Sequence, residues 1–190
     1  MKKKLDPATL LQYSGQHLHY EIIMLWRTAD ALRNHAKHTT EYSALLESFA
    51  THLRNLIEFL FDKSSGKYVR AKDFFANPAH WNATRSAGWN RLHERACNEV
   101  NHLGKDREDN PSARVWPISD ILKQIEPILK DFAAKADHRR LNAKIRKLFG
   151  QPPAPAASPT ATVYVSTTIN ASTTTPTVSY VIVGDKIKQE

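Results

Sequence analysis

Arg95 and His102 lie seven residues apart in a segment, residues 89–102, that has the pattern of a helix. At about 100° per residue, seven positions make almost two full turns, so both side chains point in the same direction. A guanidinium can bind two phosphate oxygens at once, and an imidazole exchanges a proton near neutral pH. The spacing therefore suggests a site that binds a phosphate and moves a proton beside it.

The helix that must position this pair has two distinct faces. Its apolar residues recur every three or four positions and should face the protein core, whereas the opposite face is polar. The alternative to a ligand site is a solvated basic helix face. The apolar stripe consists of Trp89, Leu92, Ala96, Val100 and Leu103, and the polar face consists of Arg91, Arg95, Asn98, Glu99 and His102.

Helical periodicity extends over residues 6–149, and short connections favour an antiparallel bundle of four to five helices. The predicted fold class is therefore all-α, followed by a low-complexity C-terminal tail. Residues 62–85 form a long connection, and long connections in compact domains are often functional. The expected boundary residues are Asp6 and Pro7 at the first helix, Gly15 as its weak point, Thr40, Ser86, Gly104, Pro117, Pro127 as a kink, and Asp137.

Composition indicates a basic protein without disulfides. The 190-residue chain has 27 Lys and Arg against 19 Asp and Glu, and the excess lies before Gly150. Such a balance favours anionic partners, among them nucleic acid. A single cysteine, Cys97, fits a reducing compartment. No apolar stretch is long enough to cross a bilayer or to follow Lys2–Lys4 as a signal peptide, so we expect a soluble, cytoplasmic protein without membrane contact.

Composition changes abruptly after Gly150, which divides the chain into a helical domain (1–150) and a tail (151–190). Residues 151–159 should form an extended, proline-rich linker. Two strand-like runs follow, at 162–166 and 177–183. Because a lone hairpin is marginal in water, we expect the tail to be disordered, with a conditional β-hairpin as the alternative.

A polar strip runs along the most apolar predicted helix, which contains Arg54, Asn55 and Glu58. Arg54 and Glu58 are four residues apart, so the simplest expectation is a mutual salt bridge. If this helix packs against the one that carries Arg95 and His102, the strip could meet that pair, with Arg54 contacting phosphate and Glu58 orienting the imidazole.

Other residue clusters give weaker indications. The histidines lack the carboxylate partners and spacing of metal sites, so no metal or cofactor is expected. The tryptophans are best interpreted as core or loop anchors, with Trp81 the one to test for base stacking. The outer face of the last helix is basic, at Arg139, Arg140, Lys144, Arg146 and Lys147, and by default is solvated.

The Arg95–His102 spacing, late in a helical bundle, resembles the signature of the HEPN superfamily, whose members are small helical bundles. Residues 20–120 also resemble a group of bacterial helical-bundle proteins, through segments 45–60, 73–75 and 101–107. This second resemblance implies a family without implying a function.

The HEPN resemblance implies RNA binding, a homodimer and, in many members, metal-independent endoribonuclease activity in toxin or defence systems. Arg95 would hold the scissile phosphate, and His102 would act as general base or acid on a ribose 2′-hydroxyl. Ala96 departs from the polar residue that usually follows the arginine. Arg91, Asn98 and Arg107 are further candidates for phosphate or RNA contacts. The competing hypothesis is a non-catalytic dimeric module whose tail recruits a protein partner.

Overall fold

The computed structural model describes residues 5–37, 39–62, 68–98 and 116–151, together with two strands at 164–168 and 177–181. The chain separates into two compact units, Met1–Pro153 and Ala154–Glu190. The division lies within three residues of the boundary predicted at Gly150.

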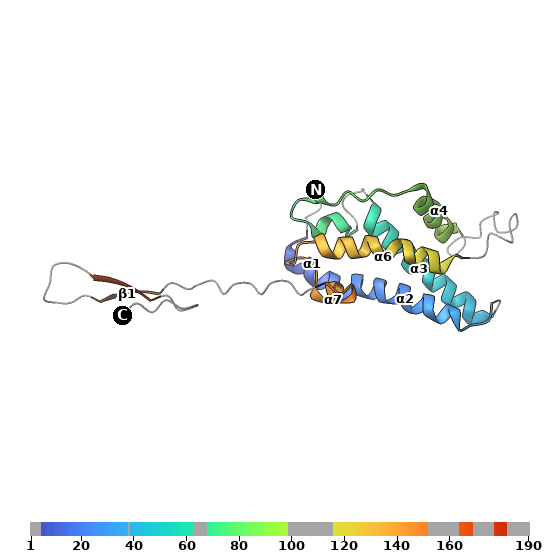
Figure 1. Ribbon diagram of the computed structural model, residues 1–190, viewed down its shortest axis with the longest axis horizontal. Helices are drawn as coiled ribbons and strands as arrows, with labels where there is room; N and C mark the ends of the chain where they lie inside the picture. The colour runs from blue at the N-terminus through green and yellow to red at the C-terminus, as the bar shows by residue number, and fades with distance from the viewer. Residues whose placement is uncertain are drawn as a thin grey trace. The chain divides into compact units, whose positions relative to one another are not determined.

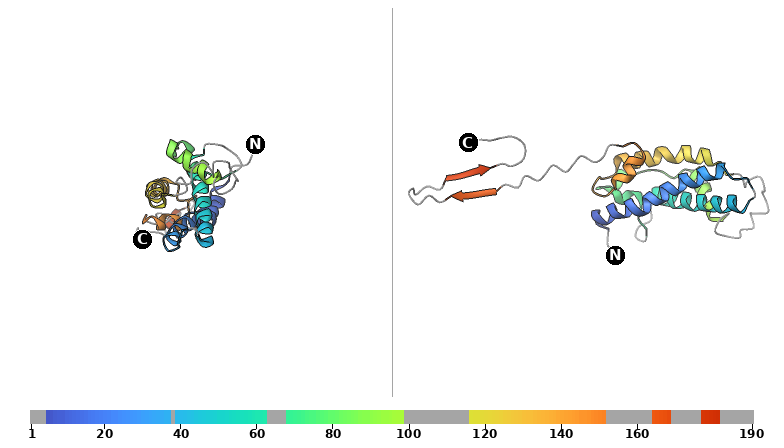
Figure 2. Two further views of the ribbon diagram at one scale, coloured as in Figure 1. Left: turned by 90° about the vertical axis from the view of Figure 1, so that its right-hand side faces the viewer. Right: turned by 90° about the horizontal axis from the view of Figure 1, so that it is seen from below.

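The first unit is a helical bundle, which confirms the predicted all-α fold class (Figure 1). Helices α2 and α3 pack side by side, and α4 packs on α3. Seen end-on, α3 lies between α2 and α4 (Figure 2). The elements are α1 (Pro7–Tyr13), the π-helical turn η1 (Ser14–Leu18), α2 (His19–Arg33), α3 (Thr40–Phe61), the 3₁₀ turns η2 (Ala71–Phe74) and η3 (Pro78–His80), α4 (Ala87–Ala96), α6 (Ile118–Lys135) and α7 (Ala143–Leu148).

The core is built around α3, whose buried side chains extend around more than half of the helix. Large aromatic residues join it to neighbouring elements: Phe59 packs against Phe74 of η2 and against Phe132 of α6. The apolar face of α6 is buried at Ile121, Leu122, Ile125, Leu129 and Phe132, and the helix continues through Pro127. The buried residues of α3 are Phe49, Ala50, His52, Leu53, Leu56, Ile57, Phe59, Leu60 and Phe61.

Most helix ends match the sequence prediction, and two differ. Asp6 and Ser86 cap α1 and α4 through their side chains, as expected. The cap of α3 is Thr39, one residue before the predicted Thr40. The cap of α7 is Asn142 rather than Asp137, because residues 138–140 form a turn in which Asp137 binds the Arg139 amide.

Two of the basic residues assigned to a solvated outer face are structural. Arg146 is buried and donates to the carbonyls of Ala133 and Ala136, so it satisfies the open C-terminal end of α6. Arg140 donates to the carbonyls of Asp73 and Phe75 and fixes the chain after η2. Arg140 thus lies in the turn before α7, which begins later than predicted, and Arg146 is buried next to Ile145.

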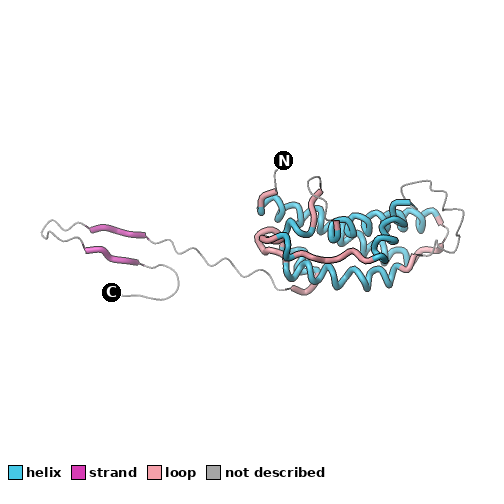
Figure 3. Tube along the Cα trace, turned by 90° about the horizontal axis from the view of Figure 1, so that it is seen from above, coloured by secondary structure: helices cyan, strands magenta, loops and turns pink. Residues whose placement is uncertain are grey.

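A loop without helix or strand follows η3 at residues 81–86 and leads along the bundle into α4 (Figure 3). Trp81 anchors its start: the indole Nε1 donates to the Leu60 carbonyl at 2.7 Å, and the ring stacks on Phe75. Trp81 is thus a structural anchor, as expected for the tryptophans, and its ring packs against Phe75 inside the protein.

The second unit contains an antiparallel hairpin of β1 (Tyr164–Thr168) and β2 (Thr177–Val181). The register pairs Tyr164 with Val181 and Thr168 with Thr177. These ten residues form the hairpin that the sequence analysis gave as the alternative, and the remaining residues after 151 lie outside the described part of the chain.

Gly15 lies in η1, where it allows the close approach of α7. A Cβ at this position would lie 2.6 Å from Asn142 Nδ2 and 2.9 Å from Asn142 Cγ. Asn142 has little freedom to move, because its side chain caps α7 and its backbone N–H donates to the Ser14 hydroxyl at 2.9 Å. The predicted weak point of the first helix is therefore a packing site.

We predict that Gly15→Ala lowers the free energy of unfolding by about 1–3 kcal/mol, although alanine is the better helix former. Gly88→Ala is the matched control, since the added methyl would meet only the Ser86 hydroxyl at 3.5 Å. That variant should be neutral or slightly stabilised. Urea unfolding followed by circular dichroism measures both, and equal stability of the two variants would contradict the packing role of Gly15.

Candidate functional site

The predicted polar face of α4 is present in the described part of the helix. Arg91 and Asn98 are exposed, and Arg95 is half-buried. The Arg95 guanidinium carbon lies 4.5 Å from the centre of the Trp116 ring, a cation–π arrangement that holds this side chain against the start of α6. His102, Arg107, Glu99, Val100 and Leu103 lie outside the described residues, so the Arg95–His102 pair stays a prediction.

The polar strip of α3 meets α4 through a histidine that the sequence analysis did not single out. Glu58 Oε1 lies 3.0 Å from His93 Nε2, and Arg54 Nε lies 3.9 Å from the same carboxylate oxygen. The expected Arg54–Glu58 ion pair is therefore confirmed. An ionised carboxylate only accepts hydrogen bonds, so Nε2 of His93 is the donor and Nδ1 is the nitrogen left to exchange a proton.

His93 and Arg95 are turned to different sides of α4. Two positions along a helix correspond to a rotation of about 200°, whereas Arg91, Arg95 and Asn98 lie within about 60° of one another. Packing of α3 against α4 thus brings His93, rather than Arg95, to Glu58. The structure gathers Arg54, Glu58 and His93 in one cluster and leaves Arg91, Arg95 and Asn98 on a second face.

A second polar cluster joins α3 to α2. Glu21 Oε2 accepts a hydrogen bond from His52 Nδ1 at 2.8 Å and one from Asn55 Nδ2 at 3.1 Å. His52 is buried, and its ring lies edge-on to Tyr20. These contacts fix the rotation of α3 relative to α2, and they hold the Glu21 carboxylate at one place.

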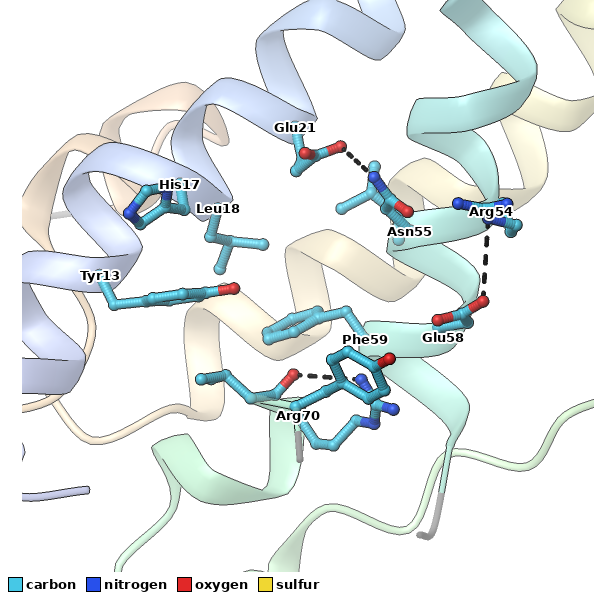
Figure 4. Close-up of a pocket in the computed structure, with 12 residues that line it drawn as sticks. Tyr13, His17, Leu18, Glu21, Arg54, Asn55, Glu58, Phe59 and Arg70 are labelled. Carbon is cyan, nitrogen blue, oxygen red and sulfur yellow. Dashed lines mark hydrogen bonds and ion pairs between the residues drawn. The ribbon is translucent and has the colours of Figure 1, made fainter. Parts of the chain in front are cut away.

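The two clusters border a pocket of about 520 Å³. Figure 4 shows the Tyr13 hydroxyl, the Glu21 carboxylate and the Asn55 amide directed toward the space beside the Phe59 ring. Arg54 and Glu58 lie on the opposite wall from Tyr13. The lining residues are Tyr13, His17, Leu18, Glu21, Arg54, Asn55, Leu56, Glu58, Phe59, Tyr68, Val69 and Arg70.

Two ionisable groups of the pocket, Arg70 and Tyr13, have different electrostatic surroundings. Arg70, whose side chain is 7% exposed, binds Asp62 at 2.7 Å and lies over the Tyr68 ring. Burial raises the pKa of the Tyr13 phenol above its ordinary value of 10.0, and the negative charge of Glu21 raises it further, while Arg70 acts in the opposite direction. The Tyr13 phenol that lines the pocket is therefore neutral at ordinary pH.

No single signal in the sequence could have found this pocket. Tyr13, Glu21 and Arg70 come from three separate segments, and each is unremarkable in its own helix or turn. Glu21 and Asn55 become neighbours only when the rotation of α2 against α3 is known. Arg54 and Glu58 are the two predicted site residues that line the pocket.

Comparisons with protein-family models, curated proteins and solved structures found no match to this chain. Within the residues that the structure describes, no helix is long and apolar enough to span a membrane. The same residues contain no group of three or more His, Cys, Asp or Glu side chains arranged to hold a metal ion.

We predict that one tyrosine ionises later than the others in an alkaline titration followed by ultraviolet absorbance, and that Tyr13→Phe removes it. Because the pKa is raised in the folded state, the neutral phenol stabilises the fold, and this contribution is lost as pH rises above about 10. Tyr13→Phe should therefore lose less stability than the wild type across that range.

The exposed Tyr20 supplies the control. Tyr20→Phe should retain the late-ionising tyrosine, since it leaves the pocket unchanged. A late-ionising group that persists in Tyr13→Phe would contradict the raised pKa of Tyr13.

Proposed function

We propose that this protein binds RNA and cleaves it as a metal-independent endoribonuclease of HEPN type, acting as a homodimer. The observation that carries the proposal is the cluster of Arg54, Glu58 and His93, in which one carboxylate oxygen lies 3.0 Å from an imidazole and 3.9 Å from a guanidinium. A toxin or defence role is the biological setting that the HEPN resemblance implies.

The cluster contains the groups that cleavage through a ribose hydroxyl requires. Glu58 orients His93, so that Nδ1 can take the proton of a 2′-hydroxyl. The 2′-oxygen then bonds to phosphorus, and the bond from phosphorus to the 5′-oxygen breaks. That oxygen takes up a proton from water, and the protonated imidazole returns its proton to the solvent. The products are a 2′,3′-cyclic phosphate and a 5′-hydroxyl, and the Arg54 guanidinium can bind the charged phosphate during the step.

The second face of α4 supports RNA binding rather than chemistry. Arg91 and Asn98 are exposed, and Arg95 is held in place over Trp116. Basic side chains on one helix face contact phosphates with an affinity that falls as salt concentration rises. Arg107 extends this set in the sequence, and His102 is the alternative imidazole that the HEPN resemblance favours.

We predict that the wild-type protein cleaves end-labelled RNA in the presence of EDTA and leaves cyclic-phosphate ends. His93→Ala should reduce the rate at least about 100-fold, the low end of what a positioned acid or base contributes. Glu58→Gln should reduce kcat more than it raises KM, because Glu58 positions the imidazole without touching RNA.

His80→Ala is the matched control, since His80 is exposed on η3 and away from the cluster. Loss of activity in His102→Ala alone would assign the chemistry to the Arg95–His102 pair instead. Intact RNA with the wild-type protein would contradict the endoribonuclease proposal.

The second candidate function, a protein-interaction module, is favoured by the hairpin of β1 and β2. Two strands alone are marginally stable, and within the described residues each strand has one edge without backbone partners. A partner strand added to either edge would complete a larger sheet. A chain truncated after residue 151 separates the two functions, because RNA cleavage would survive the truncation and partner binding would not.

A further inference from the structure

We propose that the pocket between α2 and α3 binds a small organic cation, an amine with an apolar body, whose ammonium group pairs with Glu21. Arg54 and Glu58 border both this pocket and the proposed cleavage cluster, but the inference does not depend on RNA cleavage. The inference rests on the balance of charges around the pocket, on its hydrogen-bond acceptors and on its aromatic walls.

Glu21 is the carboxylate of this pocket that lacks a permanently charged partner. Arg70 is matched by Asp62 at 2.7 Å, and Arg54 faces Glu58 at 3.9 Å. The partners of Glu21 are the His52 imidazole and the Asn55 amide, and no lysine or arginine of the described residues lies within ion-pair distance of it. Among the described residues, Glu21 is therefore the carboxylate of this pocket whose charge no lysine or arginine compensates.

Three polar groups on the Glu21 side of the pocket can accept hydrogen bonds. Both hydrogen bonds to Glu21 end on Oε2, so Oε1 accepts none from the described residues. The Asn55 amide donates through Nδ2, which leaves its oxygen as an acceptor (Figure 4). The Tyr13 hydroxyl can also accept. An ammonium group has three donors and no acceptor, so it complements this arrangement better than a carboxylate or phosphate does.

The arginines do not turn the pocket into an anion site. The Arg54 guanidinium faces the Glu58 carboxylate, with Nε 3.9 Å from Oε1, so its positive charge is compensated on the pocket wall. The Arg70 guanidinium is held by Asp62 and covers the Tyr68 ring.

The aromatic rings and the volume of the pocket indicate that the ligand carries an apolar group beside its amine. Tyr13, Phe59 and Tyr68 line the pocket, and aromatic faces attract organic cations. A volume of about 520 Å³ is much larger than an inorganic ion needs and lies in the range of small-molecule sites. An amine with a ring or a short apolar chain fits both features.

The test measures binding of 2-phenylethylamine to the full chain by calorimetry, at a pH about two units above the ordinary pKa of histidine. Two probes of similar shape serve as comparisons, neutral 2-phenylethanol and anionic 3-phenylpropionate. We expect saturable binding of the amine at one site, weaker binding of the alcohol and none of the acid. Glu21→Gln should raise the Kd of the amine about tenfold or more, which corresponds to about 1.4 kcal/mol.

Two further variants separate recognition from damage to the fold. Glu47→Gln, at an exposed position of α3, should leave the Kd unchanged. Arg54→Gln removes a positive charge from the pocket wall, so it should tighten amine binding, whereas a purely structural defect would weaken it. The proposal is overturned by absence of amine binding to the wild type, by an unchanged Kd in Glu21→Gln, or by preferred binding of 3-phenylpropionate. Each of these results is independent of whether RNA is cleaved.

Discussion

The burial of α3 is the constraint on which the rest of this bundle depends. Its buried positions span roughly 200° of the helix circumference. Helices α2 and α4 pack against it, and α6 contacts it through Phe132. Polar side chains on such a helix can be accommodated only along the remaining strip, where they meet neighbouring helices. An unpaired polar group at such a boundary costs stability, and both His52 and Glu58 of α3 have partners on the neighbouring helices.

These partnerships hold two reactive groups in place, the Glu21 carboxylate and the His93 imidazole. On the α2 side, His52 and Asn55 bind Glu21 and hold one carboxylate beside a pocket. On the α4 side, Glu58 binds His93 and orients an imidazole. Arg54 and Glu58 border both regions, so the interactions that fix the rotation of α3 also define the candidate site.

Sequence patterns predicted the helices and their inward faces because burial repeats with the helical period. The Arg54–Glu58 pair was predictable for the same reason, since both residues lie on one helix four positions apart. The contacts of Glu58 with His93 and of Glu21 with Asn55 were not, because they depend on how one helix is rotated against another. A shift of helix α7 by a few residues likewise changed Arg146 from an expected surface residue into a buried cap of α6. Local spacing thus predicts which side chains share one face of a helix. Which of them contact a neighbouring helix depends on how the helices pack.

The orientation of His93 by Glu58 is the central claim, and the tautomer of His93 tests it most directly. Long-range proton–nitrogen NMR distinguishes the two neutral tautomers of an imidazole at alkaline pH. The contact predicts that His93 carries its proton on Nε2 in the wild type, and that Glu58→Ala, which removes the acceptor, leaves a mixture of tautomers. A His93 ring protonated on Nδ1 in the wild type, or a tautomer unaffected by Glu58→Ala, would contradict the account.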